Sequence, residues 1–507
     1  MRLSLTSPSL WLTACGLITV LTGCGPKKSG TETASGTTSG TAKPGEPAAS
    51  SDKVPITTAS DEARTLYIRG RDLADQARAH DARQLFQQAA AKDPTFALVH
   101  YNLALSSPTA KESYEHLKQA VALSSKASEG ERLMILSLQA GADADSKKSL
   151  DYVEELVAKY PRDERPHVLL GLLYLNQQDF NKSIPELTKA IEINPNYSPA
   201  YNLLGYAYMP LEKYPDAEKA FKNYIELVPN DPNPYDSYAE MLMKTGRFDE
   251  SIAQYQKALS VDPHFSNSFI GIATNMMLQG KHDQAAAEAQ KLYDAARDDG
   301  DRRSALFARS VIYVDAGKTA AALKEIEKAY ALDAKLADTA NMGGDAVSLG
   351  NILLEAGEPD EAAKRFRQAS DLIEKSSLSA DVKEDNQLAA HYNTARVALA
   401  KGDIATAKKE SEQYTSGAAS QNNVLRIRQA HELSGTIALK ERDYDGAIRH
   451  LGQGNQQDPQ VIFWTALAYQ GKGDTAKAKE WAAKAANANV LSQVTYAFVR
   501  EKAKKME

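Results

Sequence analysis

Very few residues of this 507-residue sequence stand in patterns that could do chemistry. Gly317-Lys318-Thr319 has the form of the end of a phosphate-binding loop, whose backbone and lysine would hold a nucleotide phosphate. That loop needs another glycine five residues before Gly317, where the sequence has Ile312. It also needs a preceding strand, whereas this triplet falls in the turn between two expected helices. We therefore assign no nucleotide site to it.

The histidines and carboxylates do not have the spacing of metal sites either. His431-Glu432 begins like the zinc-binding helix of a metalloprotease, but Gly435 stands where the second histidine would be. The acidic run Asp298–Asp301 lacks the spaced ligands and the final glutamate of a calcium loop. Carboxylate pairs are too common on the expected helices to nominate a general acid and base. We expect no catalytic residue, no metal and no cofactor, and hence no enzyme.

Cys24 is the one residue for which the sequence predicts a covalent modification. An apolar stretch of 12 residues, Leu10 to Leu21, follows Arg2 and is too short to span a bilayer. The segment Leu21-Thr22-Gly23-Cys24 then resembles the bacterial lipobox. This resemblance implies a lipoprotein signal peptide over 1–23, lipidation of Cys24 and a lipid anchor in the membrane.

The residue after Cys24 is Gly25 rather than aspartate. By the same resemblance, this favours the periplasmic face of the outer membrane if the host is Gram-negative. Cys15 also ends a short lipobox-like pattern, but the sequence after it is still apolar. An ordinary secretory signal cleaved near Cys24 is the alternative.

Residues 24–59 are expected to form a flexible tether. They are rich in Gly, Ser, Thr, Ala and Pro and contain almost no large apolar residue. Such a composition cannot bury enough surface to offset the entropy of ordering the chain. Both cysteines of the protein lie at or before the start of this segment, so the rest of the chain can form no disulfide.

The elements that follow repeat with a period of 34 residues. Prolines keep this interval at Pro161, Pro195, Pro229 and Pro263. Small residues keep it at two further places: Gly171, Gly205, Ala239 and Ala273, and then Ser183, Ala217, Ser251 and Ala285. A sustained period of this length predicts a stack of two-helix units. A helical bundle rich in alanine and leucine is the alternative, but it would not explain the regular prolines.

The residues of one unit show which repeat this is. They are Tyr201, Leu204-Gly205, Tyr208, Ala217, Phe221 and Pro229. Their spacing resembles the tetratricopeptide repeat, W-x2-L-G-x2-Y followed by A-x3-F and P. The resemblance implies an all-α, right-handed superhelical solenoid of about eleven to twelve helix hairpins, with the best repeats over 164–265. Such solenoids usually bind other molecules and rarely catalyse.

Breaks in the pattern suggest how the solenoid is divided. We expect an N-terminal array over 60–300, a C-terminal array over 301–489 and a polar capping helix over 490–507. Segments near 298–301, 341–345 and 376–385 interrupt the register, and Gly343-Gly344 is the best candidate hinge. One unit is shortened, because Ser106-Ser107-Pro108 replaces a full turn.

The resemblance places a ligand in a concave groove lined by the first helix of each unit. Positions one step off the packing stripe should face it, which gives a row of candidate residues. These are Leu172, Asn202, Tyr206, Met209, Asp236, Glu240, Met243, Thr274 and Met277. Methionine suits a surface that accepts varied apolar shapes, so we expect a protein or peptide segment there. The alternative is that these methionines fill gaps in the core.

Two more specific partners are disfavoured. Members of the family that clamp a C-terminal carboxylate use Lys and Asn, but the corresponding row here holds Val168, Asn202 and Asp236. The net charge of −6 is spread without a basic block, which argues against nucleic acid.

We therefore expect a non-enzymatic scaffold lipoprotein that mediates protein–protein interactions in the bacterial cell envelope, in assembly or secretion. A surface glycan-binding lipoprotein is one alternative, although it would need exposed aromatic platforms. Only Trp464 and Trp481 follow the expected signal segment. An accessory subunit of an envelope enzyme is the other alternative.

Overall fold

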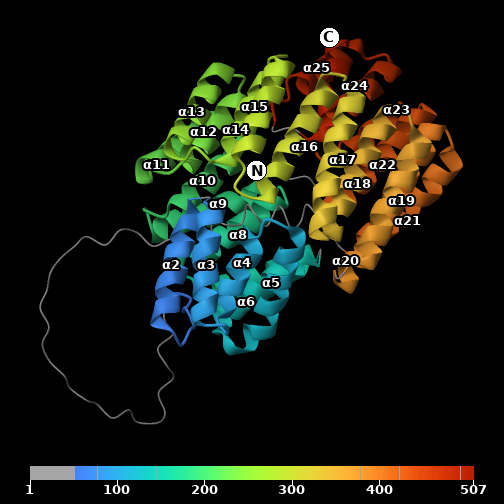
Figure 1. Cartoon of the computed structure of the whole chain (residues 1–507). Helices are drawn as coiled ribbons and strands as arrows, with labels where there is room; N and C mark the ends of the chain where they lie inside the picture. Colours follow the sequence, from blue (N-terminus) through green and yellow to red (C-terminus); the bar gives the residue numbers. More distant parts are fainter. Residues whose placement is uncertain are drawn as a thin grey trace, which may run out of the picture.

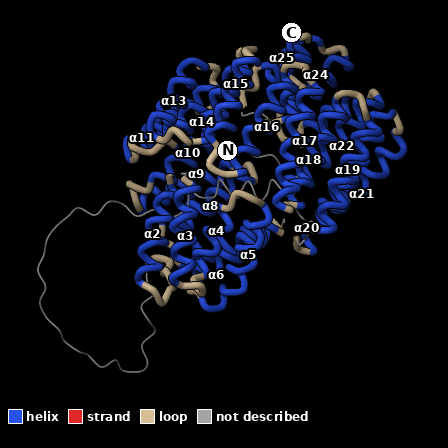
Figure 2. The backbone as a smooth tube through the Cα atoms, in the orientation of Figure 1, coloured by secondary structure: helices blue, strands red, loops and turns tan. Residues whose placement is uncertain are grey.

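The computed structural model describes residues 52–506, apart from 77, 144, 377, 422, 491 and 492. In that part of the chain every regular element is a helix (Figure 2). Consecutive helices pack as twelve hairpins, which we call units 1 to 12. The all-α solenoid and its number of hairpins are thus as predicted. None of the described helices is both long and apolar enough to cross a membrane.

Each unit has a first and a second helix. The first helices of units 1 to 12 are α2 (Asp61–Asp75), α4 (Ala97–Ser106), α6 (Glu129–Ala142), α8 (Glu164–Asn176), α10 (Ser198–Tyr208), α12 (Asn233–Lys244), α14 (Ser266–Leu278), α16 (Asp299–Asp315), α18 (Thr339–Glu355), α20 (Ala380–Lys401), α22 (Val424–Glu441) and α24 (Pro459–Lys472). The second helices are α3 (Ala79–Lys92), α5 (Ala110–Leu123), α7 (Ser146–Lys159), α9 (Phe180–Ile193), α11 (Tyr214–Leu227), α13 (Phe248–Val261), α15 (His282–Ala295), α17 (Thr319–Leu336), α19 (Pro359–Lys375), α21 (Ile404–Ser420), α23 (Tyr444–Leu451) and α25 (Thr475–Ala486). Two short helices follow, α26 (Val494–Ala497) and α27 (Arg500–Lys504).

The turn inside many units is made by a left-handed glycine. Gly317 has φ of +69° between α16 and α17, a conformation that a side chain disfavours. In unit 4 the turn has no glycine, and the Asp179 carboxylate at its end accepts the backbone N–H of Lys182 and so caps α9. The triplet Gly317-Lys318-Thr319 is therefore an inter-helix turn, as the sequence predicted.

The two helices of a unit touch through the small residues of the repeat. A Cβ atom on Gly205 would lie 2.5 Å from the Phe221 ring, so only glycine fits there. Ser183 Oγ donates to the Gly171 carbonyl at 2.7 Å, and Ser251 makes the same bond to Ala239. These bonds satisfy hydroxyls that the packing has buried.

Histidines also follow the repeat, a regularity that the sequence analysis missed. Four first helices carry a histidine four residues before the small residue. Each histidine faces a side chain on the second helix of its unit, three residues after the small residue of that helix, as His167 faces Glu186 after Ser183. The pairs are His100–His116, His167–Glu186, His391–Glu410 and His431–His450, with closest ring-nitrogen distances of 3.3, 2.7, 2.6 and 3.2 Å. These histidines therefore join the two helices of one unit.

The superhelix returns onto itself after seven units. The inner turn of one unit meets the start of the unit seven places later, from units 1 and 8 through units 5 and 12. The contacts are Arg83–Asp298 (3.1 Å), Lys111 N–Asp338 (3.3 Å), Asp143–Ser379 (2.6 Å), Gln178–Arg428 (2.7 Å) and Pro210 O–Gln457 (3.4 Å). Figure 1 accordingly shows α16 to α18, in yellow, between the first units in blue and α19 to α22 in orange. Successive turns are in contact, so the solenoid is not an open coil.

Three details differ from the sequence predictions. Residues 52–59, placed in the flexible tether, lie in contact with units 2 to 4 because their backbone finds hydrogen-bond acceptors there. The prediction of a single capping helix over 490–507 is wrong, because the helix is interrupted at Phe498-Val499, between α26 and α27. The candidate hinge residues Gly343 and Gly344 lie in no loop: they are buried inside the continuous helix α18, where Gly343 lies against Ile373.

Candidate functional site

The predicted groove row is buried in this structure. Tyr206 and Glu240 come from adjacent first helices, and the tyrosine hydroxyl donates to the carboxylate at 2.9 Å. Ser268 Oγ likewise donates to Asp236 at 2.7 Å. Most members of the row are less than a tenth exposed: Leu172, Asn202, Met209, Asp236, Met243, Thr274 and Met277. The row therefore joins neighbouring units, and its binding of a partner stays a prediction.

The methionines of the row lie in hydrophobic clusters. Met209 shares a cluster with Phe221 and Tyr238 of units 5 and 6. Met243 and Met277 belong to a larger cluster that also holds Val494 and Ala497 from the C-terminal end. Part of the chain itself thus closes this apolar surface.

The corresponding positions of the C-terminal array line a polar pocket. Asn351 follows the small residue Gly350, and Arg396 follows Ala395, just as Tyr206 follows Gly205. Tyr392 and Glu432 lie three residues before the small residue of their helices, as Asn202 does. The pocket, counted together with the open space at its mouth, measures about 680 Å³. The remaining lining residues are Gln178, Leu425, Arg428, Gln429, Asn455, Asp458, Gln460, Trp464, Gln493, Thr495 and Tyr496.

Two arginines give the pocket fixed donors. Arg396 lies over the Tyr392 ring at 5.4 Å and donates to Asn351 Oδ1 at 2.8 Å. Arg428 donates to the Gln178 side chain at 2.7 Å and to the Gln177 carbonyl at 3.2 Å, which ties unit 11 to unit 4. Both guanidinium groups are thus held in place at the edge of the pocket.

Two carboxyl groups of the pocket have raised pKa values. Burial, with the nearby charge of Asp458, raises the pKa of Glu432 to about 8. Burial also raises the pKa of Asp458 to about 7, although its carboxylate caps α24 by accepting the Gln460 N–H at 2.7 Å. Near neutral pH these groups can donate as well as accept hydrogen bonds. The pocket therefore combines aromatic faces with amides, guanidinium groups and carboxyls, which suits the backbone and polar side chains of a peptide.

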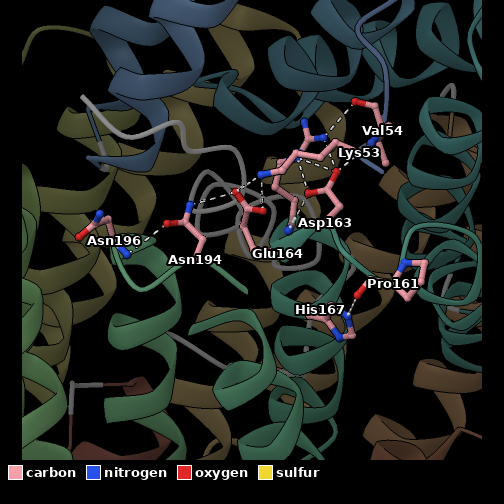
Figure 3. Close-up of polar contacts among 9 residues, drawn as sticks. Lys53, Val54, Pro161, Asp163, Glu164, His167, Asn194 and Asn196 are labelled. Atoms are coloured by element: carbon pink, nitrogen blue, oxygen red, sulfur yellow. Dashed lines mark hydrogen bonds and ion pairs between the residues drawn. The ribbon is translucent and has the colours of Figure 1, made fainter. Parts of the chain in front are cut away.

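A second surface already holds an extended segment of the same chain. Residues 52–59, which we call the strap, run across the starts of α8 and α6 and the loop between α3 and α4. Figure 3 shows the upstream end of the strap, where Lys53 and Val54 lie beside Glu164 and Asp163. The backbone N–H groups of Val54, Thr57 and Ala59 donate to carboxylates from three successive units. These are Asp163 at 2.8 Å, Glu131 at 2.7 Å and Asp93 at 3.3 Å. The units thus provide one backbone acceptor each to an extended chain.

Charged groups hold the upstream end of the strap. Lys53 Nζ lies 2.7 Å from the buried Glu164 carboxylate, and Asn194 donates to the same carboxylate at 3.1 Å (Figure 3). Arg165 donates to the Val54 carbonyl at 3.0 Å and pairs with Asp163. These hydrogen bonds hold the pKa of Asp163 below its usual value against the opposing effect of burial. Cys24, the signal segment 1–23 and tether residues 24–51 lie outside the described residues.

Comparison with protein-family models identifies the repeat. Residues 165–197 and 233–265 match one model of the tetratricopeptide repeat, and residues 186–219 match another. The chain contains tetratricopeptide repeats. Proteins with these repeats generally mediate protein–protein interactions, and their scaffold is typically non-enzymatic. No curated protein matches the sequence.

Several solved structures are similar over part of the chain, and the first two below are described as tetratricopeptide-repeat proteins. A protein of Thermus thermophilus matches 42% of this chain and 98% of its own, at 22% identity and a TM-score of 0.28. One from Parabacteroides merdae matches 54% and 94%, at 16% identity and 0.35. MamA from Desulfovibrio magneticus matches 34% and 96%, at 18% identity and 0.28.

Proposed function

We propose that this chain is a non-enzymatic scaffold lipoprotein, which binds a protein segment in the bacterial cell envelope during assembly or secretion. Its tetratricopeptide repeats support the binding role. The lipobox-like sequence ending at Cys24 supports the anchor and hence the compartment.

The observation that carries the proposal is the pocket of the C-terminal array. Four successive first helices, α18, α20, α22 and α24, contribute polar or aromatic side chains to it. These include positions that are one residue past, or three residues before, the small residue of the repeat. A segment lying across the first helices would meet Asn351, Arg396, Glu432 and Trp464 in turn.

The strap supports the same conclusion from a different surface. It shows that successive units can each give one side chain to an extended backbone. Binding of this kind depends on regular spacing between units, which the repeat supplies.

The test is a pull-down of the full chain from crosslinked bacterial envelopes. We expect the double variant Arg396→Ala, Trp464→Ala to reduce recovery of a specific protein partner about tenfold or more. Lys408→Ala is the matched control, because Lys408 forms its 2.6 Å ion pair with Glu441 on exposed surface and lines no part of the pocket. Equal recovery by all three proteins would contradict the proposal, as would retention on glycan columns with no protein partner.

The anchor is tested separately. Cys24→Ser is expected to move the protein from the membrane fraction to the aqueous fraction and to abolish incorporation of a labelled fatty acid. A natural chain that takes up no label, or a Cys24→Ser variant that takes up as much label as the natural chain, would refute lipidation at Cys24.

A further inference from the structure

After α25, the second helix of the last unit, the C-terminal end of the chain passes through α26 and then packs on α25 again through α27. α27 packs against α25 through Val499 and Ala503, whose cluster includes Ala485 and Ala486. α26 packs mainly against α16 and α18, the first helices of units 8 and 9, and also contacts α24 of the last unit. Residues 493–498, which we call the plug, therefore stand between the last unit and the middle of the solenoid.

The plug has two faces with different surroundings. Val494, Ala497 and Phe498 join the apolar cluster that contains Met243, Ile270 and Met277. Gln493, Thr495 and Tyr496 instead line the polar pocket of the C-terminal array. The plug is thus the common wall of the buried groove surface and the pocket. Without it, the two would form one groove with an apolar side and a polar side.

The contacts that hold the plug are weaker than those of a repeat unit. α26 has four residues and α27 five, so neither is stable as a helix by itself. Next to the plug, Arg500 donates to the Leu278 carbonyl at the end of α14, but its Nη1 atom is buried without a hydrogen-bond partner. Lys502 and Glu355 form a half-exposed ion pair at 3.0 Å, a kind of contact that contributes little.

We infer that the plug is an intramolecular occupant of the partner-binding groove, and that the partner is a short protein segment of the same pattern. That pattern has apolar side chains at positions i, i+3 and i+4, as in Val494, Ala497 and Phe498. Hydroxyl or amide side chains occupy the opposite side, as in Gln493, Thr495 and Tyr496. The partner segment binds by displacing the plug, while α27 stays on the last unit. This inference rests on the proposed function, since it names the partner of that same surface.

The probe is a labelled synthetic peptide with the sequence of residues 490–500. It is titrated into the full chain and into the full-length double variant Val494→Asp, Phe498→Asp. The variant's own plug cannot pack on the apolar cluster, whereas Val499 and Ala503, which hold α27 on the last unit, are unchanged. We expect saturable binding to the variant and binding at least about tenfold weaker to the natural chain, because its tethered plug competes at high effective concentration.

Two controls match the probe and the receptor. A peptide carrying the same two aspartates should not bind the variant. A full chain with Glu501→Gln, which removes a 2.8 Å contact to Lys504 on the exposed side of α27, should bind the probe as weakly as the natural chain. A folded variant that fails to bind the peptide, or equal binding to natural and variant chains, would overturn the inference.

A measurement on the natural chain covers the case in which the variant does not fold. Amide hydrogen exchange should be at least about tenfold faster at residues 495–498 than in α25, because opening of the plug needs no unfolding of a unit. Equal protection of the two segments would show that the plug is a permanent part of the fold. If these tests of the plug fail, the proposed function still holds as long as binding of the envelope partner depends on Arg396 and Trp464. Loss of that dependence, with peptide binding retained, would reject the proposed function instead.

Discussion

The two ends of the described chain both lie against the solenoid, but they are held by different forces. The strap is fixed by its backbone: Asp163, Glu131 and Asp93 accept its N–H groups, and Arg165 holds the Val54 carbonyl. The plug is held by apolar side chains, and an exposed ion pair flanks it. Buried charged hydrogen bonds are costly to break, whereas a few small apolar contacts are not. The comparison indicates a permanent N-terminal contact and an exchangeable C-terminal one.

The strap and the plug also meet different edges of the superhelix. The starts of the first helices of units 8 to 12 are covered by units 1 to 5, whereas no earlier turn among residues 52–506 covers units 2 to 4. The strap takes that place. At the other end, Asn489 lies beside Gly246 of unit 6, and Arg500 reaches Leu278 of unit 7. The C-terminal segment therefore continues the seven-unit contact where a thirteenth unit would stand.

The largest effect should come from Asp163→Ala. Asp163 is fully buried, and the substitution would leave the Arg165 guanidinium without its ionic partner and the Val54 N–H without its acceptor. We expect the free energy of unfolding to fall by about 3–5 kcal/mol, as for a broken buried ion pair. Urea unfolding followed by circular dichroism measures the loss.

The same variant would contradict the difference between the two ends if hydrogen exchange changed in both the strap and the plug. Hydrogen exchange should quicken in residues 53–59 and stay unchanged at 495–498. The double variant Asp163→Leu, Arg165→Met removes both charges and should recover part of the lost stability. No change in strap protection would show that Asp163 does not hold it.

The second effect in size concerns pH at the pocket beside the plug. The pKa of Glu432 is about 8 in the fold against about 4.3 in an unfolded chain, so the folded state binds the extra proton between these values. Stability therefore decreases as pH rises from about 4.3 to about 8, and ionisation adds a negative charge that acts on Asp458 and on Tyr496 of the plug. We expect plug exchange, corrected for the intrinsic rate, to quicken by about tenfold or more from about pH 6 to about pH 9.

Glu432→Gln should remove the part of that pH dependence that comes from Glu432, because glutamine cannot ionise, and Asp458, whose pKa is raised to about 7, should account for the remainder. The strap responds with the opposite sign, since the pKa of Asp163 is lowered. Its contribution is present above the unfolded pKa of about 3.9 and is lost as pH falls through the folded value. A plug in the natural chain that exchanges equally fast at both ends of this pH range would contradict this assignment.

A smaller effect is expected from Arg500→Ala. It removes the hydrogen bond to the Leu278 carbonyl, which a helix C-terminus leaves without an intrahelical partner. The substitution also removes a buried nitrogen that has no hydrogen-bond partner, so the net loss should be about 1 kcal/mol or less. Exchange at 495–498 should rise severalfold while the urea midpoint stays nearly unchanged. A fall in the midpoint as large as that of Asp163→Ala would show that plug and strap are held equally.

The smallest effect is expected from Lys502→Ala. Its ion pair with Glu355 is half exposed and therefore screened by salt. Plug exchange should change by less than about twofold at about 0.15 M salt, with a slightly larger effect at low salt. A large change that persists at about 1 M salt would show that this contact anchors the C-terminal end.

The repeat made much of the fold predictable. Pro161 to Pro263 gave the period, Gly205 and Ala217 gave the close contact between helices, and Gly317 marked a turn. Each of these residues acts on neighbours within its own unit, so its role can be read locally. The candidate hinge Gly343-Gly344 lies inside a continuous α18, where Gly343 packs against Ile373, and motion about it stays a prediction. The lack of large apolar side chains predicted a flexible end at 52–59, but backbone groups hold that segment.

The candidate site was harder to predict for a related reason. The rule that chose Tyr206 and Glu240 also selects Asn351 and Arg396. The second pair lines the pocket of the C-terminal array, whereas the first pair is joined by a hydrogen bond between adjacent units. Which copy of the repeat is covered depends on the strap, the plug and the unit seven places away. None of those contacts follows from the residues of one unit.

The sequence by itself determined the two-helix unit, its period and the order of its helices, because these depend on contacts within and between adjacent units. Only the tertiary structure decided that the superhelix closes after seven units and that both described ends lie upon it. The rotation from one unit to the next is small, and its sum over seven units decides which edges meet. A local pattern cannot specify that sum, and it therefore could not show which surface stays open to a partner.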